Sequence, residues 1–567
     1  MSTTMLPTTL PSNPRQRWVG LAVLVVAVTL VAVDATVLSL AIPSISETLR
    51  PSGTQLLWIG DAYSFVLAGL LVSMGALSDR IGRKKLLLTG SAAFGVASLL
   101  AAYAPGPGWL ILARALLGVA GATIMPATLS LIRALFPDAR ERATAIGIWG
   151  AGAAAGAALG PVVGGVLLEH FWWGSVFLLN IPVVVVLLVL GGWLLPESKD
   201  PAPGRWDVTS VLLSMAGVIG VVYAVKEAAA HGLLRWDVPL TAVLGAAALT
   251  VFVRRQLRLA TPLLDVRLFA DRRFTAAVLA SLTALVGLSG VVFVMSQYLQ
   301  LVRGYEPLRA GLAELPAFAG AVAGGLLTAR LARRAGVRAA LTGGLLAMGT
   351  GLGMLGLVRE DSAYLLIAVA FLIVGTAEGV VYALSADMAL GAAPAEKSGA
   401  ASAVSETAYE LGTALGIALV GSVVGAVYAG ALVVPAGTDA AAAAQAGESL
   451  GGAVEAAGHL PAQLGGPLLA GANGAFVQGL NLAALLGGGL LLASAGLIWV
   501  LLRGTSASRR GQGRQHPDQH REAAGGGSVP VGGGSVPVGG GSVPAGYGSV
   551  PVGEGSEPAP AGVRPAA

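Results

Sequence analysis

The stretch GALSDRIGRKK at residues 75–85 recurs in altered form as GLLTARLARR at residues 325–334. Each stretch is a short basic segment between two long apolar runs. Four residues of the first stretch are identical at the matching positions of the second: Gly75, Leu77, Arg80 and Arg83. The acid of the first stretch, Asp79, is replaced by Ala329. The repeat predicts two corresponding halves of six helices, with a substrate path at the interface between them.

The composition indicates the class of protein. Hydrophobic residues make up 55% of the 567 residues and charged residues only 11%, where about 25% is usual in soluble domains. We therefore expect an all-α polytopic membrane protein. The chain has no cysteine, which excludes disulfides and thiolate metal sites, and its five histidines show no metal-ligand spacing. No metal site is expected, and the net charge of +5 is attributed to membrane orientation rather than to nucleic-acid binding.

Apolar runs of about 20 residues predict fourteen membrane-spanning helices. They cover residues 18–42, 55–77, 86–104, 109–133, 143–168, 175–195, 208–229, 238–256, 274–299, 309–330, 338–358, 362–388, 399–430 and 474–502. With the N-terminus inside, 28 of the 35 lysines and arginines fall on the cytoplasmic side and five on the outer side. Positively charged loops stay in the cytoplasm, so both termini are expected there, in the cytoplasmic membrane of the cell.

The predicted organisation has six parts. They are a cytoplasmic N-terminus (1–17), an N-terminal six-helix half (18–195), two inserted helices with linkers (196–273), a C-terminal six-helix half (274–505), an outer loop within that half (431–473) and a tail (506–567). A seven-residue unit of the type GGGSVPV occurs five times in the tail. Its glycine and proline content cannot bury a core, so the tail is predicted to be disordered.

Ionised residues inside the spans each cost about 2.5–3.5 kcal/mol at a helix centre, so each calls for a functional reason. The candidates for proton coupling or cation binding are Asp34, Asp61, Arg114, Glu314, Glu378, Glu406 and Glu410. Asp34 leads because it lies past the middle of its span. Glu406 and Glu410 are one helical turn apart, which suits carboxylates that load and release a proton. Exposure to a cytoplasmic funnel is the alternative for these two, and surface exposure is the alternative for Glu314 and Asp61.

The segment 75–85 is itself a candidate gate. Asp79 can pair with arginine or cap a neighbouring helix N-terminus, and would then act as a latch that holds one conformation. The residues expected to form this cytoplasmic gating loop are Gly75, Asp79, Arg80, Gly82 and Arg83. The alternative is that these charges only orient the chain.

A second candidate motif is GAAAGAALGPVVGG at residues 152–165. Its glycines recur every four residues and leave a smooth groove on one helix face, while the proline invites a bend. The residues concerned are Gly152, Gly156, Gly160, Pro161, Gly164 and Gly165. We expect the groove to pack against the opposite half and to close the outer path. The alternative is ordinary close packing of membrane helices.

Two apparent nucleotide-binding motifs fail on context. GLGMLG at 351–356 lies within a predicted span with no strand before it, and GAAPAEKS at 391–398 lacks the glycine and spacing of a P-loop. We expect neither an enzyme nor a cofactor, with protons as the coupling ion.

The chain resembles drug:proton antiporters of the major facilitator superfamily, of the fourteen-span EmrB/QacA type. The resemblance covers roughly residues 15–505. It is carried by VDATVLSLAIP (33–43), by GALSDRIGRKK, by Arg114 with Gly118 and Gly121, and by the glycine motif at 152–165. It implies proton coupling through Asp34 and Arg114.

Within that family, residues 398–416 are similar to the QacA-like branch, which exports quaternary ammonium and other lipophilic cations. The branch's membrane acids map onto Asp34, Asp61 and Glu406. One departure is the pair of tryptophans at 172–173, where the family often has an arginine between aromatic residues.

The sequence therefore predicts a monomeric multidrug efflux antiporter for lipophilic cations. In the expected mechanism, Asp34 with Glu406 or Asp61 holds the cation, and protonation from outside releases it. A dedicated exporter of an endogenous antibiotic or other secondary metabolite is the first alternative. A membrane sensor or scaffold that acts through the tail is the second.

Overall fold

The described part of the chain is helical, and no strand occurs in it. The structure is a computed structural model that describes residues 14–51, 53–200, 207–231, 235–259 and 262–503. The expected tail and most of the expected N-terminal segment lie outside these residues. The first helices are α1 (Pro14–Leu49), α2 (Gly53–Ile81), α3 (Arg83–Ala102), α4 (Pro107–Leu135), α5 (Ala139–His170), α6 (Ser175–Leu178), α7 (Asn180–Leu194), α8 (Val208–His231) and α9 (Asp237–Arg258). The remaining α-helices are α10 (Arg272–Gln297), α11 (Pro307–Ala335), α12 (Val337–Leu355), α13 (Tyr364–Ala392), α14 (Ser398–Ala431), α15 (Ala440–Glu448), α16 (Leu450–His459) and α17 (Ala462–Leu501).

Thirteen helical stretches of the described residues are long and apolar enough to cross a membrane. The eleventh expected span, at 338–358, forms the helix α12, which packs against α13 and α17 but is not among the thirteen. Five of its nineteen residues are glycine, and these lower its mean hydropathy. The helix α12 lies close to the expected position, but its composition is less apolar than that of the other spans.

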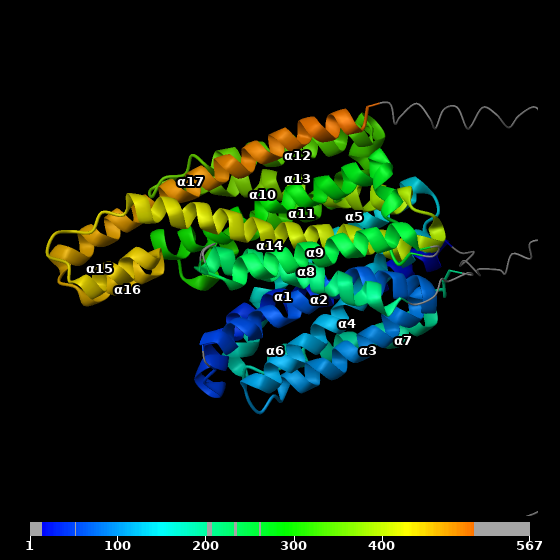
Figure 1. Cartoon of the computed structure of the whole chain (residues 1–567), viewed down its shortest axis with the longest axis horizontal. Coiled ribbons are helices and arrows are strands. Elements are labelled where there is room, and N and C mark those ends of the chain that lie inside the picture. The colour runs from blue at the N-terminus through cyan, green and yellow to red at the C-terminus, as the bar shows by residue number, and fades with distance from the viewer. Residues whose placement is uncertain (1–13, 52, 201–206, 232–234, 260–261, 504–567) are drawn as a thin grey trace, which may run out of the picture. The chain divides into compact units, whose positions relative to one another are not determined.

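The spans pack around two hydrophobic cores. Residues such as Leu24, Phe94 and Ile132 form the first core, which draws mainly on α1 to α7. The second core lies among α10 to α17 and includes Met348 and Leu491. In Figure 1 the blue and cyan helices α1–α4, α6 and α7 gather on one side, and the green-to-orange helices α10, α12 and α17 on the other. This arrangement is that of two helical halves, whose boundaries in the chain stay predictions.

The two repeated segments end their helices in the same way. Gly82 follows α2 with φ +113°, and Gly336 follows α11 with φ +81°. Side chains other than glycine are strained in this backbone region, so a glycine permits each abrupt turn into the next helix. We call the end of the helices that carries these two turns the basic end, because Arg80, Arg83 and Arg333 lie there.

The halves meet where glycines allow close approach of two backbones. On α5, a Cβ at Gly147 would collide with the carbonyl of Gly325 on α11. On α2, a Cβ at Gly75 would collide with the carbonyl of Gly399 on α14. The helix pairs α5–α11 and α2–α14 therefore form the interface between the halves, as small residues at membrane-helix contacts permit.

The inserted helices α8 and α9 form a hairpin whose first helix packs against both α2 and α14. Near the basic end, Asp207 accepts hydrogen bonds from Arg255 Nε at 2.8 Å and from Ser210 Oγ at 2.6 Å. The hydrogen bond from Arg255 is the main cause that lowers the pKa of Asp207 to about 2. A carboxyl group whose pKa is lowered in the folded protein stabilises the fold fully above its unfolded pKa of about 4. The contribution of this contact to folding stability should therefore be constant from neutral pH down to about pH 4 and be lost on further acidification.

Candidate functional site

The first buried charge cluster lies inside the N-terminal half. Asp34 on α1 is 0% exposed, and its Oδ2 accepts a hydrogen bond from Arg114 Nη1 on α4 at 3.2 Å. Its Oδ1 accepts one from Asn180 Nδ2 at 2.8 Å. The Arg114 guanidinium also lies over the ring of Tyr63, 4.7 Å from the ring centroid, and its Nε donates to the Ile59 carbonyl at 3.2 Å.

Asn180 reaches Asp34 because the sixth span is broken. The helix α6 ends at Leu178 and α7 starts at Asn180, which places this amide at the head of the second piece. Asn180 Nδ2 also donates to Ser98 Oγ on α3 at 3.0 Å. The carboxylate on α1 thus contacts α4 and α7 directly and is connected to α3 through Asn180, so a change in its protonation would affect the contacts among these four helices.

In this conformation Asp34 contacts protein groups only. Both oxygens are engaged and the side chain has no exposed surface. A substrate therefore cannot touch it here, which departs from the expectation that Asp34 itself holds the cation. Its expected role in proton coupling stays a prediction.

The second cluster lies where the halves meet. Glu406 on α14 is 1% exposed, and the Tyr382 hydroxyl on α13 donates to its Oε1 at 2.8 Å. The ring of Tyr382 stacks on Trp149 of α5 with centroids 5.9 Å apart. It also meets the edge of Tyr409 at 5.0 Å. One acid is therefore enclosed by aromatic rings from both halves.

Two further predicted acids belong to this cluster. Glu378 is half-buried on α13, one turn before Tyr382. Glu410 is half-buried on α14, one turn after Glu406 and next to Tyr409 in the chain.

The other two acids lie apart from both clusters. Asp61 is half-buried on α2 and lines a pocket at the end opposite the basic end. Glu314 is half-buried near the start of α11, and within the described residues its Oε1 has no hydrogen-bond partner. Plain surface exposure, the alternative considered for both, does not describe either.

At the basic end, Asp79 makes contacts of the kind that the latch expected at residues 75–85 requires, while its role as a gate stays a prediction. Asp79 Oδ1 accepts from Arg83 Nη2 at 3.0 Å and from the Gly399 backbone N–H at 2.9 Å. Its Oδ2 accepts from the Ala400 N–H at 3.1 Å. Asp79 thus pairs with arginine and also occupies the N-terminus of α14, where the helix dipole favours negative charge. Arg83 itself donates to the Ala395 carbonyl at 2.7 Å, across the interface of the halves.

Further contacts across the halves accompany the latch. Arg142 Nε on α5 meets Asp387 Oδ1 on α13 at 2.7 Å, and Arg133 Nη2 donates to the Ala393 carbonyl at 2.6 Å. Among the gating residues, Gly82 supplies the turn described above, and Arg80 is half-buried at the end of α2. The closed basic end therefore depends on several charged contacts, of which Asp79 makes the most.

The glycine motif packs differently from the prediction. A Cβ at Gly152 would meet Val25, one at Gly156 would meet the Thr29 carbonyl, and one at Gly160 would meet Thr36. All three neighbours belong to α1 of the same half, so the expectation of packing against the opposite half is wrong. The helix α5 continues through Pro161 to His170, Gly164 is buried, and a Cβ at Gly165 would meet nothing within 4 Å. The contact of α5 with the opposite half is instead made earlier, at Gly147.

Sequence reasoning missed Asn180, Tyr63, Tyr382, Tyr409 and Trp149. A signal was present for some of them. Asn180 is an amide within the apolar run SVFLLNIPVVVV, and a polar group within a span needs a partner. Tyr382 lies one helical turn after the half-buried Glu378, and Tyr409 one turn after the buried Glu406, so a shared helix face could have indicated them.

Removal of the latch acid should open the basic end. Because the chain has no cysteine, Ser402→Cys, at a buried position of α14, can report access. With Asp79→Asn added, we expect Ser402→Cys to react with N-ethylmaleimide about tenfold faster, since each hydrogen bond to a charged group contributes about 1.5–3 kcal/mol. Ser494→Cys, buried in α17, is the control and should be unaffected. Equal labelling of Ser402→Cys with and without Asp79→Asn would contradict the latch.

Comparisons with known proteins agree with this architecture. The family model described as Major Facilitator Superfamily matches residues 24–417. The multidrug efflux pump LfrA of Mycolicibacterium smegmatis is 47% identical over 491 residues, which cover 87% of this chain and 97% of that protein. The methyl viologen resistance protein SmvA of Salmonella typhimurium is 39% identical over 501 residues, which cover 87% of this chain and 100% of that protein.

A solved structure supports the fold alone. The crystal structure of the human organic anion transporter MFSD10 has a TM-score of 0.56 and 15% sequence identity, and the match covers 85% of this chain and 100% of that one. At this identity the likeness concerns the arrangement of helices and says nothing about the substrate.

Proposed function

Because this chain belongs to the Major Facilitator Superfamily, we propose that it exports lipophilic cationic drugs and biocides across the cytoplasmic membrane in exchange for protons. Multidrug export agrees with the name of the similar multidrug efflux pump LfrA, and an effect on a cationic compound agrees with that of the methyl viologen resistance protein SmvA. One structural observation supports the coupling: the chain holds two separate acid clusters, one sealed among protein groups and one enclosed by aromatic rings between the halves.

The two clusters suit different tasks. Asp34 is bound to Arg114 and Asn180 and is fully buried, so it suits a proton that moves without substrate contact. Glu406 lies beside Tyr382 and near Tyr409, and acids together with aromatic faces attract organic cations. We therefore assign the proton to the Asp34 cluster and the drug cation to the Glu406 cluster.

The charge distribution of the sequence assigns the basic end to the cytoplasm, so the closed latch corresponds to a protein that faces outward. In the proposed cycle a proton from outside neutralises Asp34 and weakens its pairing with Arg114. The contacts that join α1, α4 and α7 then loosen and allow the halves to rock inward. Deprotonation in the cytoplasm and cation binding at Glu406 reverse the movement. The membrane potential contributes about 2.3 kcal/mol per charge per 100 mV. In this proposal the transporter acts as a monomer and requires no cofactor.

Neutralising Glu406 should impair the export of cations selectively. For Glu406→Gln we expect the KM for ethidium to rise about tenfold, because a buried charge that faces the cation is lost. A neutral transported dye should show a much smaller change. Proton-driven uptake into everted vesicles measures both. Glu47→Gln, at an exposed position of α1, is the matched control. Equal losses for neutral and cationic dyes would contradict the assignment of the cation to Glu406.

Two other functions remain distinguishable by experiment. A dedicated exporter of one endogenous product would not be inhibited by many unrelated cations, whereas a multidrug exporter would. A sensor or scaffold that acts through its tail would lose its effect when residues 506–567 are deleted, although efflux itself would be unaltered. The buried acids Asp34 and Glu406 favour transport over scaffolding, since scaffolding needs no ionisable groups inside spans.

A further inference from the structure

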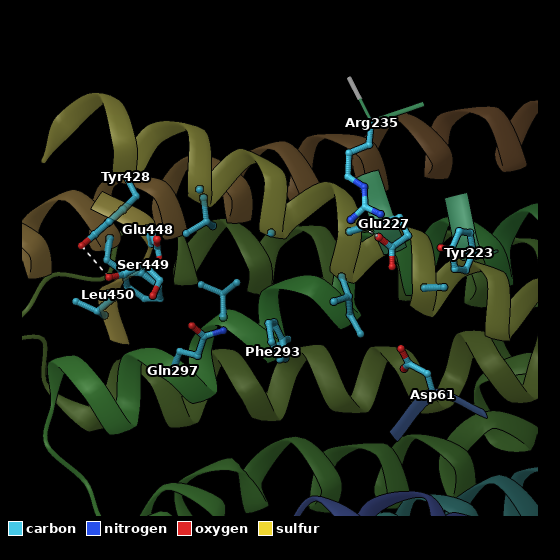
Figure 2. Close-up of a pocket in the computed structure, with 18 of the residues that line it drawn as sticks. Asp61, Tyr223, Glu227, Arg235, Phe293, Gln297, Tyr428, Glu448, Ser449 and Leu450 are labelled. Carbon is cyan, nitrogen blue, oxygen red and sulfur yellow. Dashed lines mark hydrogen bonds and ion pairs between the residues drawn. The ribbon is translucent and has the colours of Figure 1, made fainter. Parts of the chain in front are cut away.

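A pocket of about 900 Å³ lies at the end of the helices opposite the basic end (Figure 2). Both halves contribute to it, through Trp58, Asp61 and Phe65 of α2 and through Phe293 of α10. Its side is formed by α8 of the inserted hairpin. This pocket is separate from the Glu406 cluster, because neither Glu406 nor Tyr382 lines it.

The helix α8 closes the pocket by bridging the two halves. Near the basic end, Ser214 Oγ of α8 lies 3.4 Å from Ser73 Oγ of α2. Further along, Tyr223 packs near Phe65 with ring centroids 6.5 Å apart. Val218 and Val222 join the same apolar cluster, which also takes in Leu411 of α14. The inserted hairpin therefore places its outer residues at the exit between α2 and α14.

One arginine of this hairpin already occupies the pocket. Arg235, just before α9, lies 3.5 Å from Glu227 of α8 through Nη1 and 2.9 Å from Asp237 through Nη2. Figure 2 shows its guanidinium directed toward Glu227. The Arg235 side chain is 47% exposed, while that of Glu227 is 22% exposed. The pocket thus presents three acids, Asp61, Glu227 and Glu448, together with aromatic rings and a cation that is only partly buried.

We propose that this pocket is a second, outer cation site, in which the guanidinium of Arg235 and the exported cation compete for Glu227. The proposal rests on the proposed function and extends it to the release step. A lipophilic cation that leaves the Glu406 cluster finds a carboxylate with the aromatic rings of Trp58, Phe65 and Tyr223 nearby. When the cation departs, Arg235 returns to Glu227 and lowers the affinity of the site for cations outside. Arg235 would therefore oppose rebinding of the exported compound.

Competition by an impermeant cation from outside tests this site. Cells that express each variant are loaded with ethidium, and the half-inhibitory concentration of external propidium is measured relative to each variant's own uninhibited efflux. For Arg235→Gln we expect this concentration to fall about fivefold, because Glu227 becomes available to propidium. For Glu227→Gln we expect it to rise about fivefold. Both figures are of the size of one exposed ion pair.

Three variants make the test specific. The double variant Glu227→Gln/Arg235→Gln should behave like Glu227→Gln, because the arginine acts only through that acid. Arg235→Lys retains the competing charge, so its half-inhibitory concentration of propidium should be close to that of the unmodified protein. Arg309→Gln is the matched control, since Arg309 is an exposed arginine that lies over Tyr305 outside this pocket.

The outcomes separate the two proposals. If the unmodified protein shows no proton-dependent ethidium efflux, the proposed function is wrong and the outer site falls with it. A different result is proton-dependent efflux with the same half-inhibitory concentration of propidium in Arg235→Gln, Glu227→Gln and the control. That result overturns the outer site alone. A rise of that concentration in Arg235→Gln would also overturn it, because competition requires a fall.

Discussion

Asp34→Asn should abolish proton-driven ethidium efflux, with a loss of at least about a hundredfold in initial rate. Asparagine cannot exchange a proton, and Arg114 would lose its only carboxylate partner among the contacts of the described residues. Removal of one member of a buried ion pair costs about 3–5 kcal/mol, which is as large as a hundredfold change in rate requires. Uptake of ethidium into everted vesicles under an imposed pH gradient measures the rate.

A second assay separates coupling from binding. Exchange of labelled for unlabelled substrate across the membrane at equal pH needs the cation site but no net proton movement. We expect Asp34→Asn to retain it in part, because Asp34 has no exposed surface for a substrate. The double variant Asp34→Asn/Arg114→Gln removes the uncompensated arginine and serves as a control for misfolding. Full efflux by Asp34→Asn would refute the coupling role.

Gly156→Leu should eliminate transport while the protein still inserts and folds. A Cβ at this position would lie 2.8 Å from the Thr29 carbonyl oxygen and 3.0 Å from the Ala32 Cβ. A leucine must therefore push α1 away from α5, and Asp34 lies on α1 only two residues beyond Ala32. The ion pair with Arg114 would then be misplaced, with a loss of activity that we expect to exceed tenfold.

The same helix supplies the control for this prediction. Gly165→Leu adds an identical side chain at a position of α5 where a Cβ would meet nothing within 4 Å. It should retain near-normal efflux. Size-exclusion profiles of both variants report whether they fold. If Gly156→Leu fails to give folded protein while Gly165→Leu folds, the motif is a packing element and its link to Asp34 is unsupported.

The sequence was informative wherever one segment carried its own chemistry. Apolar length predicted the spans, and an acid beside arginines at a helix end predicted that Asp79 would pair with arginine or cap a helix. The structure shows that Asp79 does both. The pair with Arg83 follows from local spacing, and a carboxylate favours the positive N-terminus of any helix, but the sequence did not indicate that the capped helix would be α14.

Predictions failed or were lacking where a residue's partner lies on a distant helix. The glycines of α5 indicated close packing but not the neighbour, and α1 took the place expected for the opposite half. A groove of small residues accepts any smooth helix, so its sequence does not specify a partner. The enclosure of Glu406 by Tyr382 and Trp149 depends on three helices from both halves, and the Arg235 pocket on still more. Neither could be read from one segment.

The latch is built on one half only, because Ala329 stands where the second half would need an acid. In the proposed cycle an unloaded transporter would therefore have a one-sided equilibrium with a small inward-facing population. The apparent affinity for a drug in the cytoplasm would be reduced by that population, even with tight binding at the Glu406 cluster. The same bias would limit the leak of protons through unloaded molecules. Weak apparent affinity and tight coupling would then be two results of a single carboxylate.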